Sequence, residues 1–196
     1  NGTAEADSTV VVSLDGIEIG TVTANGAGEW TLDYTGTLLA DGDYELSVTA
    51  TNPTGNSATA TQTIVVDTTA PTVTINAIAV DDIINAVEAG SPVAVSGTTT
   101  GVEDGQVVTV TIDGNTYTAT VTGNAWTFNI PVADIANFEA TEEVVATVSD
   151  LAGNPATPAT RNITVDTVAP AVTIDSISDD TGAQANDFIT NDDTLV

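Results

Sequence analysis

One stretch of sequence occurs twice and divides the chain. Residues 65–75 read VVDTTAPTVTI and residues 164–174 read TVDTVAPAVTI, which places Asp67 and Asp166 99 positions apart (166 − 67). A period of that size predicts tandem domains rather than a solenoid of small repeats. In each copy a β-branched run ends at the aspartate, a short segment ending in Ala-Pro follows, and a new run begins. Because proline fixes φ and favours extended geometry in the preceding residue, we expect two short, stiff linkers.

Short alternating runs of apolar and polar residues fill the sequence between these linkers. Residues 72–165 contain seven such runs, the third and fourth joined by the turn Asp113-Gly114. So many short strands, separated by turn residues, predict an antiparallel β-sandwich. Aromatic residues make up only 4% of the chain while Val and Thr abound, which also favours strands over helices. We expect an acidic loop at 81–90 and a longer connection at 132–143.

Residues 1–66 repeat the same order of runs. The turn Asp15-Gly16 corresponds to Asp113-Gly114, and Trp30 corresponds to Trp126. Both tryptophans lie in runs with apolar alternation, so we expect them in the core rather than in a ligand site.

One position differs between the repeats in a way that affects the fold. Tyr44 lies where a tyrosine corner would form in a sandwich of this type. Its counterpart is Glu142, so the sequence predicts that the second repeat lacks this device.

The first repeat begins later than the second. It lacks the first strand and the acidic loop, whereas the end of the chain contains sequence for those two parts. A sheet without that strand would expose an unpaired edge and part of its core. The missing strand could be joined covalently in a longer polypeptide, or donated by the next molecule to build a head-to-tail filament. The predicted divisions are a domain lacking its first strand at 1–66, a linker at 67–71, a complete domain at 72–165, a linker at 166–170, and the opening strand and acidic loop of a further repeat at 171–196.

Charge and composition exclude several classes of function. The chain has 28 acidic residues and one basic residue, Arg161, for a formal net charge of −27. Nucleic acids and anionic membranes are therefore excluded as partners, and no apolar run is long enough to insert into a membrane. The chain has no histidine and no cysteine, and it carries no phosphate loop or nucleotide-binding motif. We predict no catalytic residues and no organic cofactor.

Four segments together resemble a known family. The junction DTTAPTVTI, the turn DLAGN at 150–154, the loop VDDIINAVE at 80–88 and the segment SGTTTGVEDG at 96–105 are similar to bacterial immunoglobulin-like (Ig-like) repeats. Such repeats form the stalks of giant type I-secreted adhesins of the RTX and biofilm-associated kinds. The resemblance covers essentially the whole chain. It implies tandem Ig-like β-sandwich domains of about seven strands each, a place outside the cell on a bacterial surface, and calcium at the junctions.

Carboxylates are expected to gather at both junctions. In a seven-stranded sandwich, the loops after strands two, four and six return to the end at which the chain enters, here near Asp67. The loop 81–90 lies at the opposite end, near Asp166. Calcium takes six to eight hard oxygen ligands, whereas the simpler interpretation is that these aspartates are ordinary solvated turn residues. The predicted calcium ligands are Asp67, Asp81, Asp82, Glu103, Asp104, Asp150, Asp166, Asp179 and Asp180.

The sequence thus predicts a structural extender segment that supports cell adhesion or biofilm formation. Its partners would be neighbouring Ig-like repeats of the same chain or head-to-tail copies. Three alternatives stay open: a subunit of an extracellular filament or sheath, a ligand-binding adhesion module, and a spacer domain of an extracellular enzyme. Exposed aromatic clusters would favour the ligand-binding module, and the chain has only eight aromatic residues (2 Trp, 3 Tyr and 3 Phe).

Overall fold

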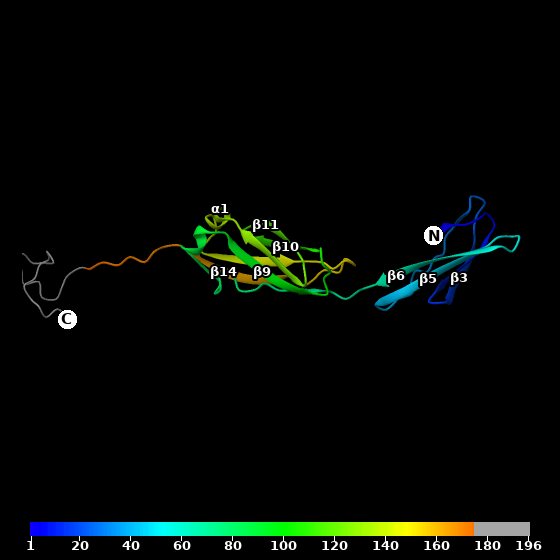
Figure 1. Ribbon diagram of the computed structural model, residues 1–196, viewed down its shortest axis with the longest axis horizontal. Coiled ribbons are helices and arrows are strands. Elements are labelled where there is room, and N and C mark those ends of the chain that lie inside the picture. Colours follow the sequence, from blue (N-terminus) through cyan, green and yellow to red (C-terminus); the bar gives the residue numbers. More distant parts are fainter. Residues whose placement is uncertain (175–196) are drawn as a thin grey trace, which may run out of the picture.

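The computed structural model describes residues 1–174, and nearly all of its regular elements are β-strands. We call residues 1–66 the first unit, residues 67–71 the link and residues 72–166 the second unit. No sheet combines strands from both units within the described residues. The two units lie end to end, with β6 running into the link (Figure 1). The first unit contains β1 (Gly2–Thr3), β2 (Thr9–Leu14), β3 (Ile17–Thr23), β4 (Glu29–Trp30), β5 (Gly42–Thr51) and β6 (Ser57–Val66).

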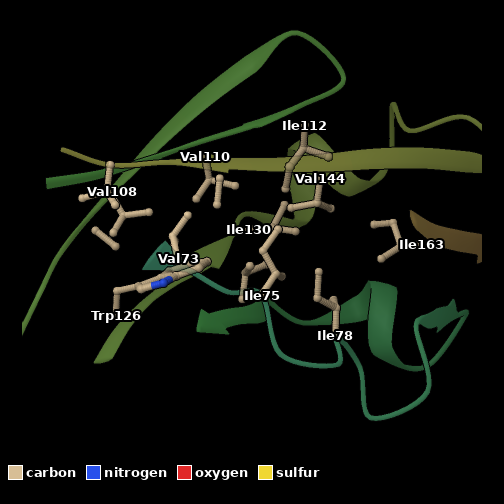
Figure 2. Packing of buried hydrophobic residues seen from close by; sticks show 14 of the residues in the cluster. Val73, Ile75, Ile78, Val108, Val110, Ile112, Trp126, Ile130, Val144 and Ile163 are labelled. Carbon is tan, nitrogen blue, oxygen red and sulfur yellow. The ribbon is translucent and has the colours of Figure 1, made fainter. Parts of the chain in front are cut away.

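The second unit is a closed sandwich of two sheets. One sheet has the order β11-β10-β13-β14-β8 and the other β12-β9-β7. Figure 2 shows side chains of the two sheets facing each other across the core. The predicted antiparallel sandwich is confirmed, with one parallel pair, β8 with β14. The strands are β7 (Thr72–Val73), β8 (Ile83–Asn85), β9 (Val93–Thr100), β10 (Val107–Ile112), β11 (Asn115–Thr120), β12 (Ala125–Ile130), β13 (Thr141–Thr147) and β14 (Ala159–Asp166), with a 3-10 turn η1 (Glu88–Gly90) and a helix α1 (Val132–Ile135).

The structure corrects the expectation of a plain loop at 81–90. This segment contains β8, which pairs in parallel with β14 and buries Ile84 completely. Three residues are too few to show an alternating pattern, and the partner strand lies some eighty residues further along the chain. The connection at 132–143 also differs, because it begins with α1 and its last residues belong to β13.

The helix α1 is short and begins after Pro131, whose φ is −65°. Within residues 1–174 the structure has no helix with the length and apolar character needed to cross a membrane.

Both Asp-Gly hairpins form as expected. Asp15 and Gly16 have φ values of 49° and 77°, and Asp113 and Gly114 have 48° and 71°. Positive φ at both central residues is the requirement of a type I′ turn, which suits the twist of a two-residue hairpin.

The segment that leads into β5 in the first unit, and into β13 in the second, is held by a different side chain in each unit. The Tyr44 hydroxyl donates a hydrogen bond to the Ala40 carbonyl (2.9 Å), which is a tyrosine corner. In the second unit Glu142 is buried, and its Oε1 accepts the backbone N–H of Glu139 (2.7 Å). The second unit lacks the tyrosine, as expected, but a buried carboxylate makes an equivalent contact with reversed polarity.

The first unit is an open sheet rather than a closed sandwich. Its main sheet has the order β3-β2-β5-β6, and β1 with β4 forms a small separate pair. Its buried apolar cluster consists of Val10, Val12 and Ala24, with Trp30 partly buried against it. In contrast, Trp126 is only 2% exposed in the second unit. The residues of β6 are exposed along almost its entire length.

Candidate functional site

The link is held from the first unit by Asp41. The Oδ1 atom of Asp41 accepts the backbone N–H of Thr68 (2.9 Å) and its hydroxyl (2.7 Å), while Oδ2 accepts the hydroxyl of Thr69 (2.6 Å). The hydroxyl of Thr69, followed by the two donors of Thr68, lowers the pKa of Asp41 below its usual value. One carboxylate therefore fixes two consecutive residues of the link.

The link is held from the second unit by Asn154. Its side-chain amide donates to the Asp67 carbonyl (3.0 Å) and also to Asp150 Oδ2 (2.9 Å). Asp67 in turn stabilises the link locally, because its Oδ1 accepts the N–H of Thr69 (2.9 Å). At the end of the link, Pro71 is buried and lies close to Gly101, where an added Cβ would be 3.6 Å from the proline Cα.

Asp150 positions Asn154. This carboxylate is 3% exposed, and its Oδ1 accepts the N–H groups of Gly153 and Asn154, both at 2.8 Å. Burial alone would raise the pKa of Asp150, but the hydrogen bonds from Asn154 and the neighbouring backbone outweigh it and lower the pKa. The turn DLAGN is thus organised around the buried Asp150, which orients the side-chain amide of Asn154 toward the link.

The other predicted ligands at this end bind neighbouring loops. Glu103 Oε2 accepts the N–H of Leu151 (2.8 Å), and Asp104 Oδ1 accepts the N–H of Gly123 (2.8 Å). Asp67, Glu103 and Asp150 are therefore connected through one chain of hydrogen bonds that passes through the turn at 150–154.

The predicted ligands at the other end make different contacts. Asp82 has a φ of 66° and pairs with Arg161 through two contacts, Nε to Oδ1 (2.6 Å) and Nη2 to Oδ2 (2.7 Å). Arg161 also donates to the Ile75 carbonyl (3.1 Å), so the single basic side chain ties the segment 75–82 to β14. The hydrogen bond from Arg161 is the main cause that lowers the pKa of Asp82.

Asp81 and Asp166 each make a local contact. Asp81 Oδ1 accepts the N–H of Ile83 (3.1 Å), and Asp166 Oδ1 accepts the N–H of Val168 (3.0 Å). A groove between Asp166 and the segment 85–88 also lies at this end. Asp179 and Asp180 fall outside the described residues. Among residues 1–174, no three carboxylates converge closely enough to form a metal-binding group.

Two residues that hold the junction were not singled out from the sequence. Asp41 and Asn154 contact the link across 27 and 87 positions of sequence, a proximity that no local pattern reveals. Their only local signal is that each belongs to an Asp- or Asn-containing turn, where such residues are common in any case.

Replacing Asp41 by alanine is expected to loosen the junction without unfolding either unit. The substitution removes the three hydrogen bonds that hold Thr68 and Thr69, and Asp41 lies outside both apolar clusters. NMR relaxation in excess chelator should then give shorter rotational correlation times for the two units than in the unsubstituted chain. Asp33→Ala is the matched control, because Asp33 is also exposed and, among residues 1–174, accepts a hydrogen bond only from Thr35. Equal correlation times in the two variants would contradict the role of Asp41.

Comparison with known proteins places the sequence in a family. The sequence model of the bacterial Ig-like domain matches residues 1–68. A search of curated proteins found no match.

Three solved structures are similar in sequence. One is described as a Ca2+-stabilized adhesin that helps an Antarctic bacterium reach out and bind ice; it is 37% identical over 85% of this chain and 42% of its own, with a TM-score of 0.48. A second, from work on the host cell surface retention of a 1.5-MDa bacterial ice-binding adhesin, is 34% identical over 86% of this chain and 56% of its own, with a TM-score of 0.46. This chain thus spans about half the length of these two relatives.

The third structure corresponds to a single domain. It is a bacterial immunoglobulin-like domain from the M. primoryensis ice-binding adhesin, 43% identical, with a TM-score of 0.39. The match covers 50% of this chain and 98% of that domain. Identity at this level over nearly a whole domain, together with the match at residues 1–68, shows that the chain belongs to the family of bacterial Ig-like domains.

Proposed function

We propose that this chain is a segment of the stalk of a large bacterial surface adhesin, with a mechanical rather than catalytic role. The observation that carries the proposal is the link, which is hydrogen-bonded from both sides, by Asp41 of the first unit and Asn154 of the second. A junction fixed in this way limits how far one unit can rotate relative to the next. A stalk needs such limits at its junctions to stay extended. The adhesin relatives support the same role.

The proposed setting follows from that role. The chain would lie outside the cell on a bacterial surface, with neighbouring Ig-like repeats as its partners. Residues 67–71 and 166–170 would be equivalent linkers, and residues 171–196 would open a further repeat. The lack of histidine and cysteine in the sequence agrees with a structural role.

Calcium is proposed to stiffen the junctions further. The carboxylate side chains around the link offer oxygen atoms, the ligand type that calcium prefers. At the first junction, three carboxylate oxygens accept no hydrogen bond from the described residues: Oδ2 of Asp67, Oε1 of Glu103 and Oδ2 of Asp104. These atoms could bind an ion while the other oxygen of each group keeps its backbone donor. We propose Asp67, Glu103, Asp104 and Asp150 for the first junction, and Asp81, Asp82, Asp166, Asp179 and Asp180 for the second.

Bound calcium should raise the thermal stability and reduce the motion between the units. Extracellular calcium modules bind with dissociation constants of about 0.1–1 mM. At roughly 10 mM calcium, each such site would add about 1.4–2.7 kcal/mol by mass action. Calorimetry and small-angle scattering, each with calcium and with excess chelator, measure the two effects. Unchanged melting and unchanged scattering after chelation would overturn the calcium proposal.

A pair of substitutions assigns the ions to the junctions. Asp67→Ala should remove binding at the first junction and leave the second, whereas Asp166→Ala should do the reverse. Calorimetric titration counts the sites that remain in each variant. If neither variant loses a site, both aspartates are ordinary residues at strand ends.

A further inference from the structure

Asp41, which holds the link, is followed directly by a glycine. The sequence contains four Asp-Gly pairs, at 15–16, 41–42, 104–105 and 113–114. An aspartate in this position cyclises readily, because glycine has no Cβ to hinder its own backbone nitrogen. Asp41 and Gly42 are both exposed, and an added Cβ at Gly42 would meet no atom within 4 Å. This pair is therefore open to a reaction between the aspartate side chain and the backbone.

The reaction joins the Asp41 side chain to the backbone of the next residue. The amide nitrogen of Gly42 bonds to Cγ of the neutral carboxyl group, whose hydroxyl leaves as water with the amide proton. Water then opens the resulting succinimide ring. Attack at the side-chain carbonyl restores aspartate, whereas attack at the main-chain carbonyl leaves isoaspartate, in which the chain continues through Cβ and Cγ. One water is lost and one is regained, so the reaction needs only the solvent.

The backbone around Asp41 lies at the edge of the regular structure. Residues 31–41 contain no strand, and Leu38 in this segment is 98% exposed. Gly42 is the first residue of β5 and pairs with Val66, the last residue of β6. Such ends open locally at lower cost than the centres of strands. The reactive nitrogen thus lies at the end of the sheet, beside the start of the link.

The link restrains the carboxyl group of Asp41. Among residues 1–174 this group accepts three hydrogen bonds, all from Thr68 and Thr69, and they engage both of its oxygens. Cyclisation expels one of these two oxygens, so a contact with the link must break before the ring closes. The hydrogen bonds from Thr69 and Thr68 also lower the pKa of Asp41, which leaves less of the neutral group that cyclises.

The other three Asp-Gly pairs do not depend on the link. Asp15 Oδ1 accepts the N–H of Glu45, and Asp104 Oδ1 accepts the N–H of Gly123, both at 2.8 Å and each within one unit. The carboxylate of Asp113 accepts no hydrogen bond from residues 1–174. The pair at 113–114 is therefore a reference within the same chain, and its reactivity should not respond to the link.

We propose that Asp41-Gly42 is a site of spontaneous isomerisation to isoaspartate, and that the closed link protects it. When the link detaches from Asp41, the carboxyl group becomes free to cyclise. Isoaspartate carries its carboxylate directly on Cα and adds a carbon to the backbone, so it no longer holds Thr68 and Thr69. An opening of the junction is thereby converted into a lasting loss of its hydrogen bonds. This consequence rests on the proposed stalk, because it concerns the stiffness of the junction.

The first test measures isoaspartate in chains aged at neutral pH in excess chelator, which removes any effect of calcium. The unsubstituted chain is compared with Thr68→Val/Thr69→Val, which removes both hydroxyl donors at nearly constant side-chain shape. Cleavage after glutamate releases residues 30–45 with Asp41 and residues 104–139 with Asp113, and fragmentation in the mass spectrometer locates isoaspartate in each. The rate at Asp41 relative to Asp113 should rise about fivefold or more in the variant, since hydrogen bonds to a charged group stabilise the closed link.

The matched control is Thr61→Val/Thr63→Val, which replaces two exposed threonines of β6 whose hydroxyls make no hydrogen bond with residues 1–174. This control should keep the relative rate of the unsubstituted chain. The same relative rate in all three chains, or an equal rise in both variants, would overturn protection by the link. Absence of isoaspartate at Asp41 in chains that accumulate it at Asp113 would overturn the site itself. These rates are read from peptides, so no such result bears on the stalk or its calcium.

The second test separates the aged chain by ion exchange into forms isomerised at Asp41 alone and at Asp113 alone. NMR relaxation in excess chelator should give shorter rotational correlation times for the two units of the first form, as expected for Asp41→Ala. The form isomerised at Asp113 should keep the correlation times of the fresh chain. Equal correlation times in the two forms would overturn the loss of the junction contact.

Discussion

Replacing Ile163 by alanine is expected to lower the free energy of unfolding of the second unit by about 2–5 kcal/mol, the usual cost of truncating a buried isoleucine. Ile163 is 1% exposed and lies in the core that Figure 2 shows. The loss combines the transfer free energy of the removed carbons with the cost of the cavity they leave. Differential scanning calorimetry, with the transition of each unit followed separately, measures the change.

The matched control for this prediction is Ile64→Ala in the first unit. Ile64 occupies the equivalent strand position but is 38% exposed, so its truncation leaves less of a cavity and should cost well under half as much. Equal costs at the two positions would contradict the open face of the first unit.

Replacing Gly97 by alanine is expected to destabilise the second unit by about 1–3 kcal/mol or more, the range for overpacking a core. An added Cβ at Gly97 would lie 1.9 Å from the Thr74 carbonyl oxygen and 2.5 Å from the Trp126 ring. The ring could shift, but the carbonyl belongs to the backbone that continues the β7–β9 pairing. The segment 72–76 would have to move away from β9 to make room. Differential scanning calorimetry, with the transition of each unit followed separately, measures the loss.

Alanine substitutions at two other glycines distinguish the steric clash at Gly97 from a general effect of replacing glycine by alanine. Gly90→Ala should change stability little, because an added Cβ there meets no atom within 4 Å. Gly2→Ala should cost less than Gly97→Ala, since only the Trp30 ring, at 2.7 Å, stands in the way. Similar losses at all three positions would contradict the steric argument.

Much of the fold could be predicted because its signals are local or strictly periodic. The Asp-Gly turns need positive φ, which Gly supplies readily and Asp tolerates, and the interval of 99 residues reveals the repeat without any structure. The strand β8 could not be predicted in the same way. Its three residues acquire their conformation from pairing with β14, and no sequence pattern within residues 81–90 indicates that partner strand.

The sequence predicts which turns lie at the candidate site, but it does not predict which of their atoms are in contact. The turns that surround the link could be identified because connections in a sandwich return to fixed ends. Which atom meets which depends on side-chain geometry, so the amide of Asn154 and the carboxylate of Asp41 became evident only in the structure. The pairing of Asp82 with Arg161 is of the same kind, since 79 positions separate the two residues.

The solitary arginine has a consequence for resistance to proteases of tryptic specificity. Enzymes of tryptic specificity cut after lysine or arginine, and this sequence offers them one internal bond, Arg161–Asn162. That bond lies within β14, where Arg161 pairs with Val144 of β13 and its guanidinium is engaged by Asp82. A protease needs an extended, accessible segment, so cleavage there must wait until β14 detaches from its sheet. A chain of such units would present trypsin-like enzymes with one protected target per copy of this sequence.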